Sequence, residues 1–101
     1  MNEKSFIAKG INISCCTMED ISYLLFEDKE EVIALNETGS VVWGFIDGNS
    51  TVSEVTAKVL DLFDGDIVKI KSSVIIFLEG LLSLGAITLS YKKFKGVMRN
   101  A

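Results

Sequence analysis

Residues 35–48, with the sequence LNETGSVVWGFIDG, constrain the fold of this chain more than any other stretch. They follow a β-like run, EEVIAL, and cross a polar break at Asn36 before a helical pattern begins. Gly48 and Asn49 end that pattern, because both tolerate the left-handed conformation that closes a helix C-terminus. The apolar positions of the pattern are Val41, Val42, Trp43, Phe45 and Ile46. One short helix is therefore predicted to join a sheet before it to helices after it, with Trp43 as a core anchor.

Three short β-like segments precede this helix. Residues 11–15 alternate apolar and polar side chains, residues 21–26 are rich in β-forming residues, and residues 31–35 form the third segment. Polar residues 17–20 and charged residues 27–30 separate them as turns. Short strands joined by tight polar turns are typical of an antiparallel meander. Residues 1–10 are predicted to be a loose start.

Three helical segments are predicted in all. Residues 37–46 form the first helix, with Asn36 as its N-cap. Residues 52–63 form the second, and Thr51 and Glu54 stand at capping-box spacing at its start. The third runs over residues 66–84 and ends at Gly85, before a short extended segment, residues 86–89, and a basic tail, residues 90–101. Strands followed by helices predict an α+β domain, a three-stranded antiparallel sheet followed by three helices, similar to a winged helix-turn-helix.

Composition limits the function classes. The 101 residues predict a single domain, ordered over about residues 9–89. Ten basic against fourteen acidic residues argue against a non-specific nucleic-acid binder, and the absence of His removes the commonest general base and metal ligand. No apolar run approaches the length of a membrane span, and no signal peptide opens the chain. We therefore expect a cytoplasmic protein with no cofactor, no metal site, no catalytic residue and no membrane partner.

The chain has two cysteines, Cys15 and Cys16, which are adjacent. Neighbouring residues of a strand point to opposite faces, so the two thiols are not expected to pair with each other or to ligate one metal. The prediction is one buried and one exposed thiol, with a redox role as the alternative.

The third helix is more apolar than one core contact requires. One stripe, spaced to face the core, consists of Ile70, Val74, Phe77, Leu78 and Leu81. A second stripe consists of Val68, Ile75 and Leu82, with Lys71 among them. Either the second stripe packs on the sheet or on residues 87–89, or it forms a groove wall for a partner, since exposed apolar surface commonly marks an interaction site.

The third strand, residues 31–35, is an edge if the strands are ordered as a meander. An edge strand carries unpaired backbone N–H and C=O groups, which can accept an added strand. An open edge beside an apolar helix suits the addition of an extended peptide, whose backbone bonds give affinity while side-chain pockets give selectivity. Pairing of two copies through the same edge is the alternative.

These segments together resemble a known family. Leu35, Asn36, Thr38, Trp43 and the run from Ile46 to Val55 follow the pattern LN-x-T-A-x-x-[IV]-W-x-L-L-D-G-x-x-[ST]-V-x-E-[IV]. Val74, Phe77, Leu78, Leu81 and residues 85–87 resemble its closing D-V-x-x-F-L-x-x-L-x-x-x-G-L-[IL]. The chain is similar to the PqqD-like family, the pyrroloquinoline quinone biosynthesis protein D group. Its members are also called RiPP (ribosomally synthesised, post-translationally modified peptide) precursor recognition elements.

The resemblance implies a winged helix-turn-helix-like domain that binds the leader part of a precursor peptide as a strand added to the third strand. It implies that the domain then presents the peptide to a modifying enzyme, such as a radical S-adenosylmethionine enzyme, or to a leader protease. The expected peptide-binding residues are Glu31, Val32, Ile33, Ala34 and Leu35 of the strand, and Ile67, Lys71, Val74, Ile75 and Leu78 of the third helix. Lys71 would suit an acidic leader residue.

The chain departs from the family pattern at three positions. Gly39 replaces the usual Ala after Thr38, Gly44 follows Trp43, and Ser73 stands where Asp is common. Each glycine is expected to weaken the first helix by about 1 kcal/mol relative to Ala. None of the three changes touches a catalytic role, since the family has none.

Three other functions compete with a peptide-binding adaptor that is a monomer or weak homodimer. A DNA-binding winged helix is disfavoured because the third helix offers only Lys69 and Lys71 and no Arg, Asn or Gln to read base edges. A structural dimerisation module remains open. An enzyme has little support, because no nucleophile–base pair and no phosphate loop is present in the sequence.

Overall fold

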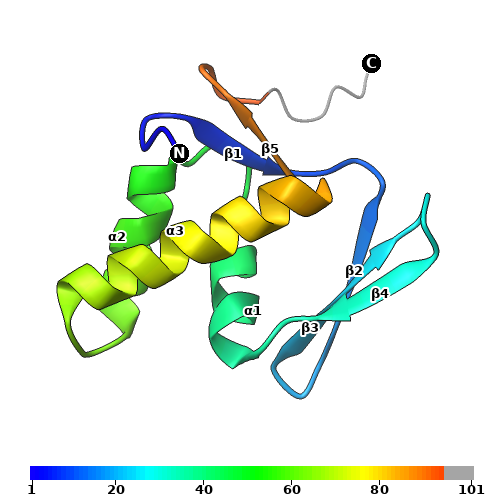
Figure 1. Ribbon diagram of the computed structural model, residues 1–101, viewed down its shortest axis with the longest axis horizontal. Coiled ribbons are helices and arrows are strands. Elements are labelled where there is room, and N and C mark those ends of the chain that lie inside the picture. Colours follow the sequence, from blue (N-terminus) through cyan, green and yellow to red (C-terminus); the bar gives the residue numbers. More distant parts are fainter. Residues whose placement is uncertain (95–101) are drawn as a thin grey trace.

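The computed structural model describes residues 1–94 and has the predicted α+β fold, a three-stranded antiparallel sheet followed by three helices (Figure 1). Two additional strands, one near each end of the chain, form a separate ladder. The elements in order are β1 (Phe6–Lys9), β2 (Ile13–Met18), β3 (Ile21–Phe26), β4 (Glu31–Ala34), α1 (Glu37–Gly44), α2 (Val52–Leu62), α3 (Ile67–Leu84) and β5 (Ile87–Ser90). Part of the basic tail expected for residues 90–101, including Lys95 and Arg99, lies outside the described residues.

The three-stranded sheet has the order β2-β3-β4, so β4 is an edge strand, as predicted. Its register places Leu24 of β3 between Cys15 of β2 and Ile33 of β4. The two connecting turns are tight, and Glu19, Asp20 and Glu30 adopt positive φ angles there. Leu24 and Phe26 are buried beneath the helices, so one face of the sheet belongs to the core.

The prediction of a loose start for residues 1–10 is wrong. Residues 6–9 form β1, which pairs antiparallel with β5, and Ile7 lies opposite Leu89. Ile7 is fully buried and belongs to the same core as Ile87. The short run from Phe6 to Lys9 has no periodicity of its own, and its partner lies at the other end of the chain, so local pattern could not reveal the pairing. Figure 1 shows this ladder beside α3, away from the three-stranded sheet.

The helix ends follow the predicted caps. Oδ1 of Asn36 accepts a hydrogen bond from Gly39 N at 2.7 Å, and Thr51 and Glu54 form a complete capping box. Gly85 closes α3 in the left-handed conformation with φ 80°. α1 ends at Gly44 and α2 at Leu62, slightly before the predicted limits. α3 begins after Asp66, whose carboxylate accepts a hydrogen bond from Val68 N at 2.9 Å.

The core lies between the helices, the inner face of the sheet and the β1–β5 ladder. Trp43 is 3 % exposed and takes part in this core, which confirms the expectation that it is an anchor. The prediction of one buried and one exposed thiol is wrong, because Cys15 and Cys16 are both exposed. β2 lies at the margin of the sheet, where the inner face is covered less than it is at β3. None of the helices in residues 1–94 combines the length and apolar character needed to span a bilayer.

Candidate functional site

The free edge of β4 is the first component of the candidate site. Among the described residues, β4 pairs with β3 alone, and Leu35 N donates a hydrogen bond to the Ser22 carbonyl at 2.8 Å. In an antiparallel ladder, successive residues direct their backbone groups to opposite sides. Because Leu35 is turned toward β3, Val32 and Ala34 must direct their N–H and C=O groups to the open side. The open edge therefore presents the backbone N–H and C=O groups of Val32 and Ala34 to an added strand.

The side chains of β4 alternate in the same way. Ile33 lies opposite Leu24 on the inner face and packs against the core. Val32, which is 62 % exposed, lies opposite Leu25 on the outer face. A strand added to this edge would turn every second side chain inward, toward the helices, and the others toward solvent.

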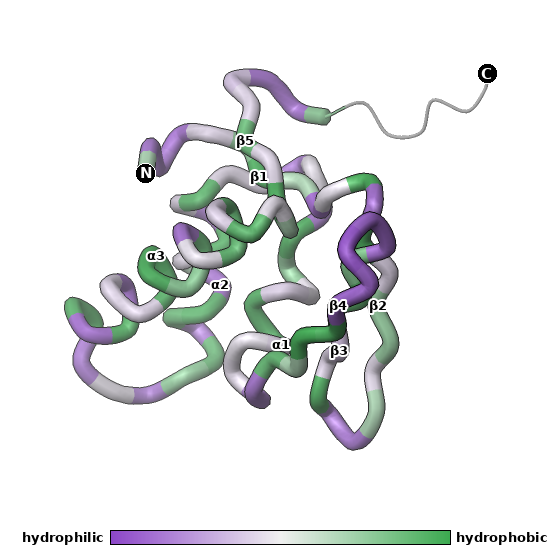
Figure 2. The backbone as a smooth tube through the Cα atoms, turned by 45° about the vertical axis from the view of Figure 1, so that its right-hand side comes forward, coloured by the Kyte–Doolittle hydropathy of each residue, from purple (hydrophilic) through white to green (hydrophobic). Residues whose placement is uncertain are grey.

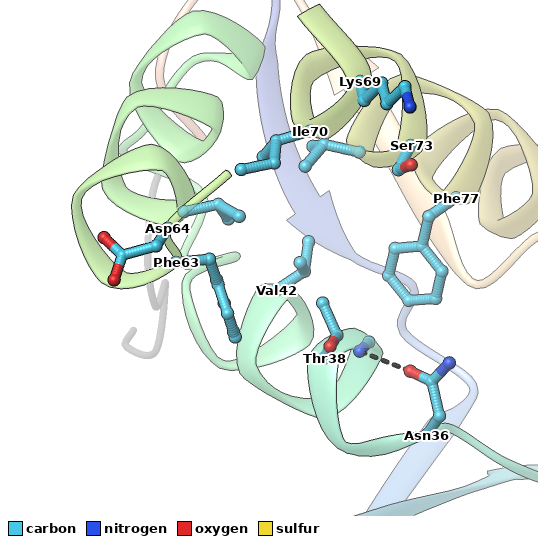
Figure 3. Close-up of a pocket in the computed structure, with 12 residues that line it drawn as sticks. Asn36, Thr38, Val42, Phe63, Asp64, Lys69, Ile70, Ser73 and Phe77 are labelled. Carbon is cyan, nitrogen blue, oxygen red and sulfur yellow. Dashed lines mark hydrogen bonds between the residues drawn. The ribbon is translucent and has the colours of Figure 1, made fainter. Parts of the chain in front are cut away.

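A cavity of about 360 Å³ opens where β4 passes into α1, between the start of α1, the end of α2 and the first half of α3 (Figure 3). Its walls are largely apolar, and Val42, Phe63 and Phe77 extend toward its interior. The Asp64 carboxylate is turned away from it in the same view. The lining residues are Asn36, Thr38, Gly39, Val42, Val59, Phe63, Asp64, Lys69, Ile70, Ser73, Val74 and Phe77. Apolar clefts with a few polar groups are typical of ligand sites.

Gly39 and Phe77 together shape one wall of this cavity. A Cβ atom added at Gly39 would lie 3.0 Å from Cε1 of Phe77 and 3.1 Å from Oδ1 of Asn36. These are closer than ordinary van der Waals contacts, so the Phe77 ring would have to shift by a few tenths of an ångström if this residue were Ala. The absence of a side chain at Gly39 thus allows Phe77 to pack beside the N-cap of α1, next to the end of β4.

The turn between β3 and β4 closes the other end of the site. Lys29 Nζ donates a hydrogen bond to the Leu84 carbonyl at 3.4 Å and lies 5.6 Å from the centre of the Phe26 ring. The turn is thereby linked to the C-terminal end of α3. It is strongly hydrophilic (Figure 2), and apart from Lys29 its charges are all acidic: Glu27, Asp28, Glu30 and the adjoining Glu31. The site thus runs from an acidic turn at one end to an apolar cavity at the other.

The α3 residues predicted for the site do not lie together. Val74 and Leu78 are 4 % and 0 % exposed, so their side chains belong to the core, although Val74 also forms part of the cavity wall. Ile67 is exposed at the first position of α3. Lys71 and Ile75 line a separate depression with Glu3, Val68, Ser72 and Ile76.

That second depression shares no residue with the cavity. Ser73 and Phe77 are each two positions from Ile75, and residues two apart on an α-helix lie about 200° apart around its axis. Val68 is 71 % exposed, so the interpretation in which the second apolar stripe packs on the sheet or on residues 87–89 is wrong for this residue, whereas Ile75 is partly buried against the core. The stripe predicted from the sequence therefore lies on the side of α3 opposite the cavity.

Sequence reasoning missed Phe77 and Ser73 as surface-lining residues. The sequence pattern places Phe77 in the core stripe, and Ser73 carries no distinguishing signal beyond its departure from the pattern that the chain resembles. The available signal was Gly39, because a glycine in a helix interior commonly permits a close approach of another group. That signal identifies a contact but not the residue that makes it.

Comparisons with known proteins agree with this fold. A solved structure described as "TbiB1 in Complex with the TbiA(beta) Leader Peptide" matches with a TM-score of 0.73 and 15% identity, covering 79% of this chain and 93% of that one. A second, "Lasso peptide synthetase B1 complexed with the leader peptide", matches with a TM-score of 0.71 and 13% identity, covering 81% of this chain and 96% of that one. At such identities the likeness concerns the fold. A comparison with curated protein sequences gives no match.

A family model gives the sequence relationship directly. The model described as "Coenzyme PQQ synthesis protein D (PqqD)" matches residues 22–87, which is well over half of the chain and spans β3 to the start of β5. This match confirms the resemblance found from the sequence motifs. The chain belongs to the PqqD family.

Proposed function

We propose that this protein is a non-enzymatic adaptor that binds the leader segment of a ribosomally made precursor peptide by strand addition to β4. The observation that carries the proposal is the open edge at Val32 and Ala34, which ends beside an apolar cavity. Family membership supports it, and both structural neighbours are complexes with leader peptides. The fold is thus one that holds such peptides in other proteins.

Binding by strand addition would use a surface that is already formed. The backbone groups of Val32 and Ala34 are fixed by the pairing of β4 with β3, so only the peptide must lose conformational freedom. An extended segment of about six to eight residues would span the edge and reach the cavity. We expect an affinity in the micromolar range or tighter, about −8 kcal/mol.

The cavity supplies side-chain selectivity in this proposal. A large apolar side chain of the leader would enter between Phe63, Ile70 and Phe77, where it would be removed from water. The acidic turn at the other end of β4 would favour a leader segment without acidic residues at that point. Lys71, which was expected to meet an acidic leader residue, lies on the other side of α3 and takes no part in this arrangement.

The partner of the loaded adaptor would be a modifying enzyme, such as a radical S-adenosylmethionine enzyme, or a leader protease, acting in the cytoplasm. The adaptor itself would hold the peptide in position and raise its local concentration at the enzyme. It would catalyse no step and would need no cofactor of its own. Specific binding to duplex DNA is not expected, since α3 carries only two basic residues, Lys69 and Lys71, and these lie on different sides of the helix in a chain of net charge −4.

The experiment is a titration of isotope-labelled protein with the leader segment of the precursor peptide encoded beside this gene. Backbone amide shifts should concentrate at Val32, Ala34 and the residues around the cavity, with slowed exchange of the two strand amides. Shifts confined to α2 or to residues 90–94 would contradict the site even if the peptide binds. Failure of the peptide to bind at all would contradict the function.

Two substitutions on opposite sides of α3 separate the cavity from the second depression. Phe77→Ala is expected to weaken leader binding at least tenfold, because Phe77 forms a cavity wall. Ile75→Ala removes an apolar side chain that is half-buried, as Phe77 is, but that lines the other depression. It should leave the affinity for the leader peptide unchanged. The reverse result would place the peptide on the Lys71–Ile75 side. Thermal melting of both variants reports whether each is folded.

A further inference from the structure

β2 provides a second open edge, at the opposite margin of the three-stranded sheet. Among residues 1–94, β2 pairs with β3 and with no other strand. It is six residues long, from Ile13 to Met18, and five of the six are exposed. It is therefore longer than the four-residue β4 edge to which the peptide is assigned.

The hydrogen-bond pattern identifies which residues of β2 have free backbone groups. Glu27 N donates to the Asn12 carbonyl at 3.0 Å, and these two residues extend the β2–β3 register. Since alternate residues face opposite sides of a strand, Ser14 and Cys16 are turned toward β3. Ile13, Cys15 and Thr17 therefore direct their N–H and C=O groups to the open edge.

The edge of β2 lacks the features that prevent an exposed edge strand from pairing with another strand. Strands that remain unpaired commonly carry charged residues, proline or bulges at the edge. Residues 13–18, with the sequence ISCCTM, contain no charge, no proline and no glycine. Two of the three residues with outward backbone groups, Ile13 and Thr17, are β-branched, which suits a paired strand. Met18, at the end of the strand, is 55 % exposed.

The charges near the two edges favour self-pairing of β2 over self-pairing of β4. An antiparallel pair of identical strands sets the start of each against the end of the other. β4 has Asp28, Glu30 and Glu31 near its start and Glu37 just beyond its end, and Lys29, the one cation among them, is engaged by the Leu84 carbonyl, so two copies would bring mostly like charges together. β2 has Glu19 and Asp20 beyond its end, but uncharged residues 10–12 and then Lys9 before its start.

We propose that two copies of this protein associate through an antiparallel β2–β2 pairing about a two-fold axis. Because only Ile13, Cys15 and Thr17 have outward backbone groups, a permitted register must pair these residues with one another. The register with Cys15 opposite the partner's Cys15 pairs all three, and the registers centred on Ser14 or on Cys16 pair two. Each register gives one six-stranded sheet in the order β4-β3-β2-β2-β3-β4. Both β4 strands then lie at the outer margins of the sheet and remain open.

The interface is small, so the association is expected to be weak and dependent on concentration. Sedimentation of the full chain from micromolar to millimolar concentration should show a monomer–dimer equilibrium. Over the same range, hydrogen exchange should slow at the amides of Ile13, Cys15 and Thr17, while Val32 and Ala34 remain unchanged. Protection at Val32 and Ala34 instead, or a monomer at every concentration, would overturn the proposal.

Matched variants test the edge without disturbing the fold. Cys15→Pro removes an outward N–H but no bond to β3, so it should abolish dimerisation while the melting behaviour persists. Cys15→Ser keeps the N–H and should dimerise like the original chain. Ala34→Pro changes the β4 edge in the same way and should leave dimerisation intact; dimer loss in Ala34→Pro but not in Cys15→Pro would contradict the assignment. Because these readouts use no peptide, they are independent of whether the leader binds.

Discussion

Gly39 and Gly44 both lie in α1, but their surroundings differ. A Cβ at Gly39 would press on the Phe77 ring, whereas a Cβ at Gly44 would meet no atom within 4 Å. Both substitutions to Ala gain helix propensity, by about 1 kcal/mol in a helix interior and less at the last position of a helix. Only the change at Gly39 also moves a wall of the cavity.

We therefore predict that Gly39→Ala weakens leader binding several-fold, while Gly44→Ala leaves binding unchanged and raises the melting temperature slightly. Calorimetric titration of both variants with the same leader peptide checks the difference in affinity, and thermal melting reports their stability. Equal affinities for the two variants would mean that the peptide does not use the cavity wall formed by Phe77.

The roles of single residues could be predicted from the sequence more accurately than the arrangement of the elements. Asn36, Thr51 with Glu54, and Gly85 were assigned as helix caps because capping depends on residue type and short spacing, which a sequence displays directly. Trp43 was assigned to the core for a similar reason, since it lies among apolar helical positions. Cys15 and Cys16 were not predicted correctly, because alternation along a strand does not reveal whether the inner face is covered at the sheet margin.

The turn between α1 and α2 contains a carboxyl group, that of Asp47, whose pKa is shifted. Oδ1 of Asp47 accepts a hydrogen bond from Asn49 N at 2.8 Å. This backbone bond, aided by Ser50 and Lys58 and opposed by partial burial, holds the pKa of Asp47 below its ordinary value of 3.8. A carboxyl whose pKa is lower in the folded state stabilises the fold at pH values above its unfolded pKa. That contribution is lost as the pH falls through the folded pKa.

Asp47→Ala is accordingly expected to lower the free energy of unfolding at pH 7 by more than it does near pH 2. Urea unfolding followed by Trp43 fluorescence at both pH values measures the two differences. Asp61→Ala, which removes an exposed carboxylate from α2, serves as the control for a general change in surface charge. A loss for Asp47→Ala that is the same at both pH values would show that the turn, and not the ionised carboxylate, is responsible.

The elements themselves were predicted nearly to their ends, but their relative orientation was not. The apolar positions of α3 fall into two stripes on a helical wheel, and the wheel contains no information about where β4 lies. Phe77 and Ile75 are equally apolar in sequence, yet Phe77 lies against Gly39 and Ile75 lies near Glu3. For this reason the strand residues of the candidate site, residues 31–35, could be predicted from their position at the sheet edge. The α3 residues of the site could not be predicted, because the side of α3 that faces β4 depends on how the whole domain packs.

At the scale of the whole molecule, the β1–β5 ladder brings the two ends of the described chain together. Ile7 is fully buried within it, while Ile11, four residues later, is 95 % exposed. Ile7→Ala should cost about 2–5 kcal/mol of stability, as for other fully buried aliphatic residues. Ile11→Ala should fall within about 0.5 kcal/mol of the original chain. Equilibrium unfolding in urea distinguishes these outcomes, and equal small losses would mean that β1 is not part of the cooperative core.

The same ladder has a consequence for how the chain reaches its native state. β1 pairs with β5, the last element in the described part of the chain, so this ladder cannot form until all three helices have been synthesised. Contacts between such distant segments raise the contact order, and the entropy of closing so long a loop must be met before they form. The other side of β1 has earlier partners, because Ile7 N donates a hydrogen bond to the Ser50 carbonyl and Gly48 N donates one to the Ile7 carbonyl. The β5 side of β1 is then the half that forms last, and the core around Ile7 is completed only after synthesis passes β5.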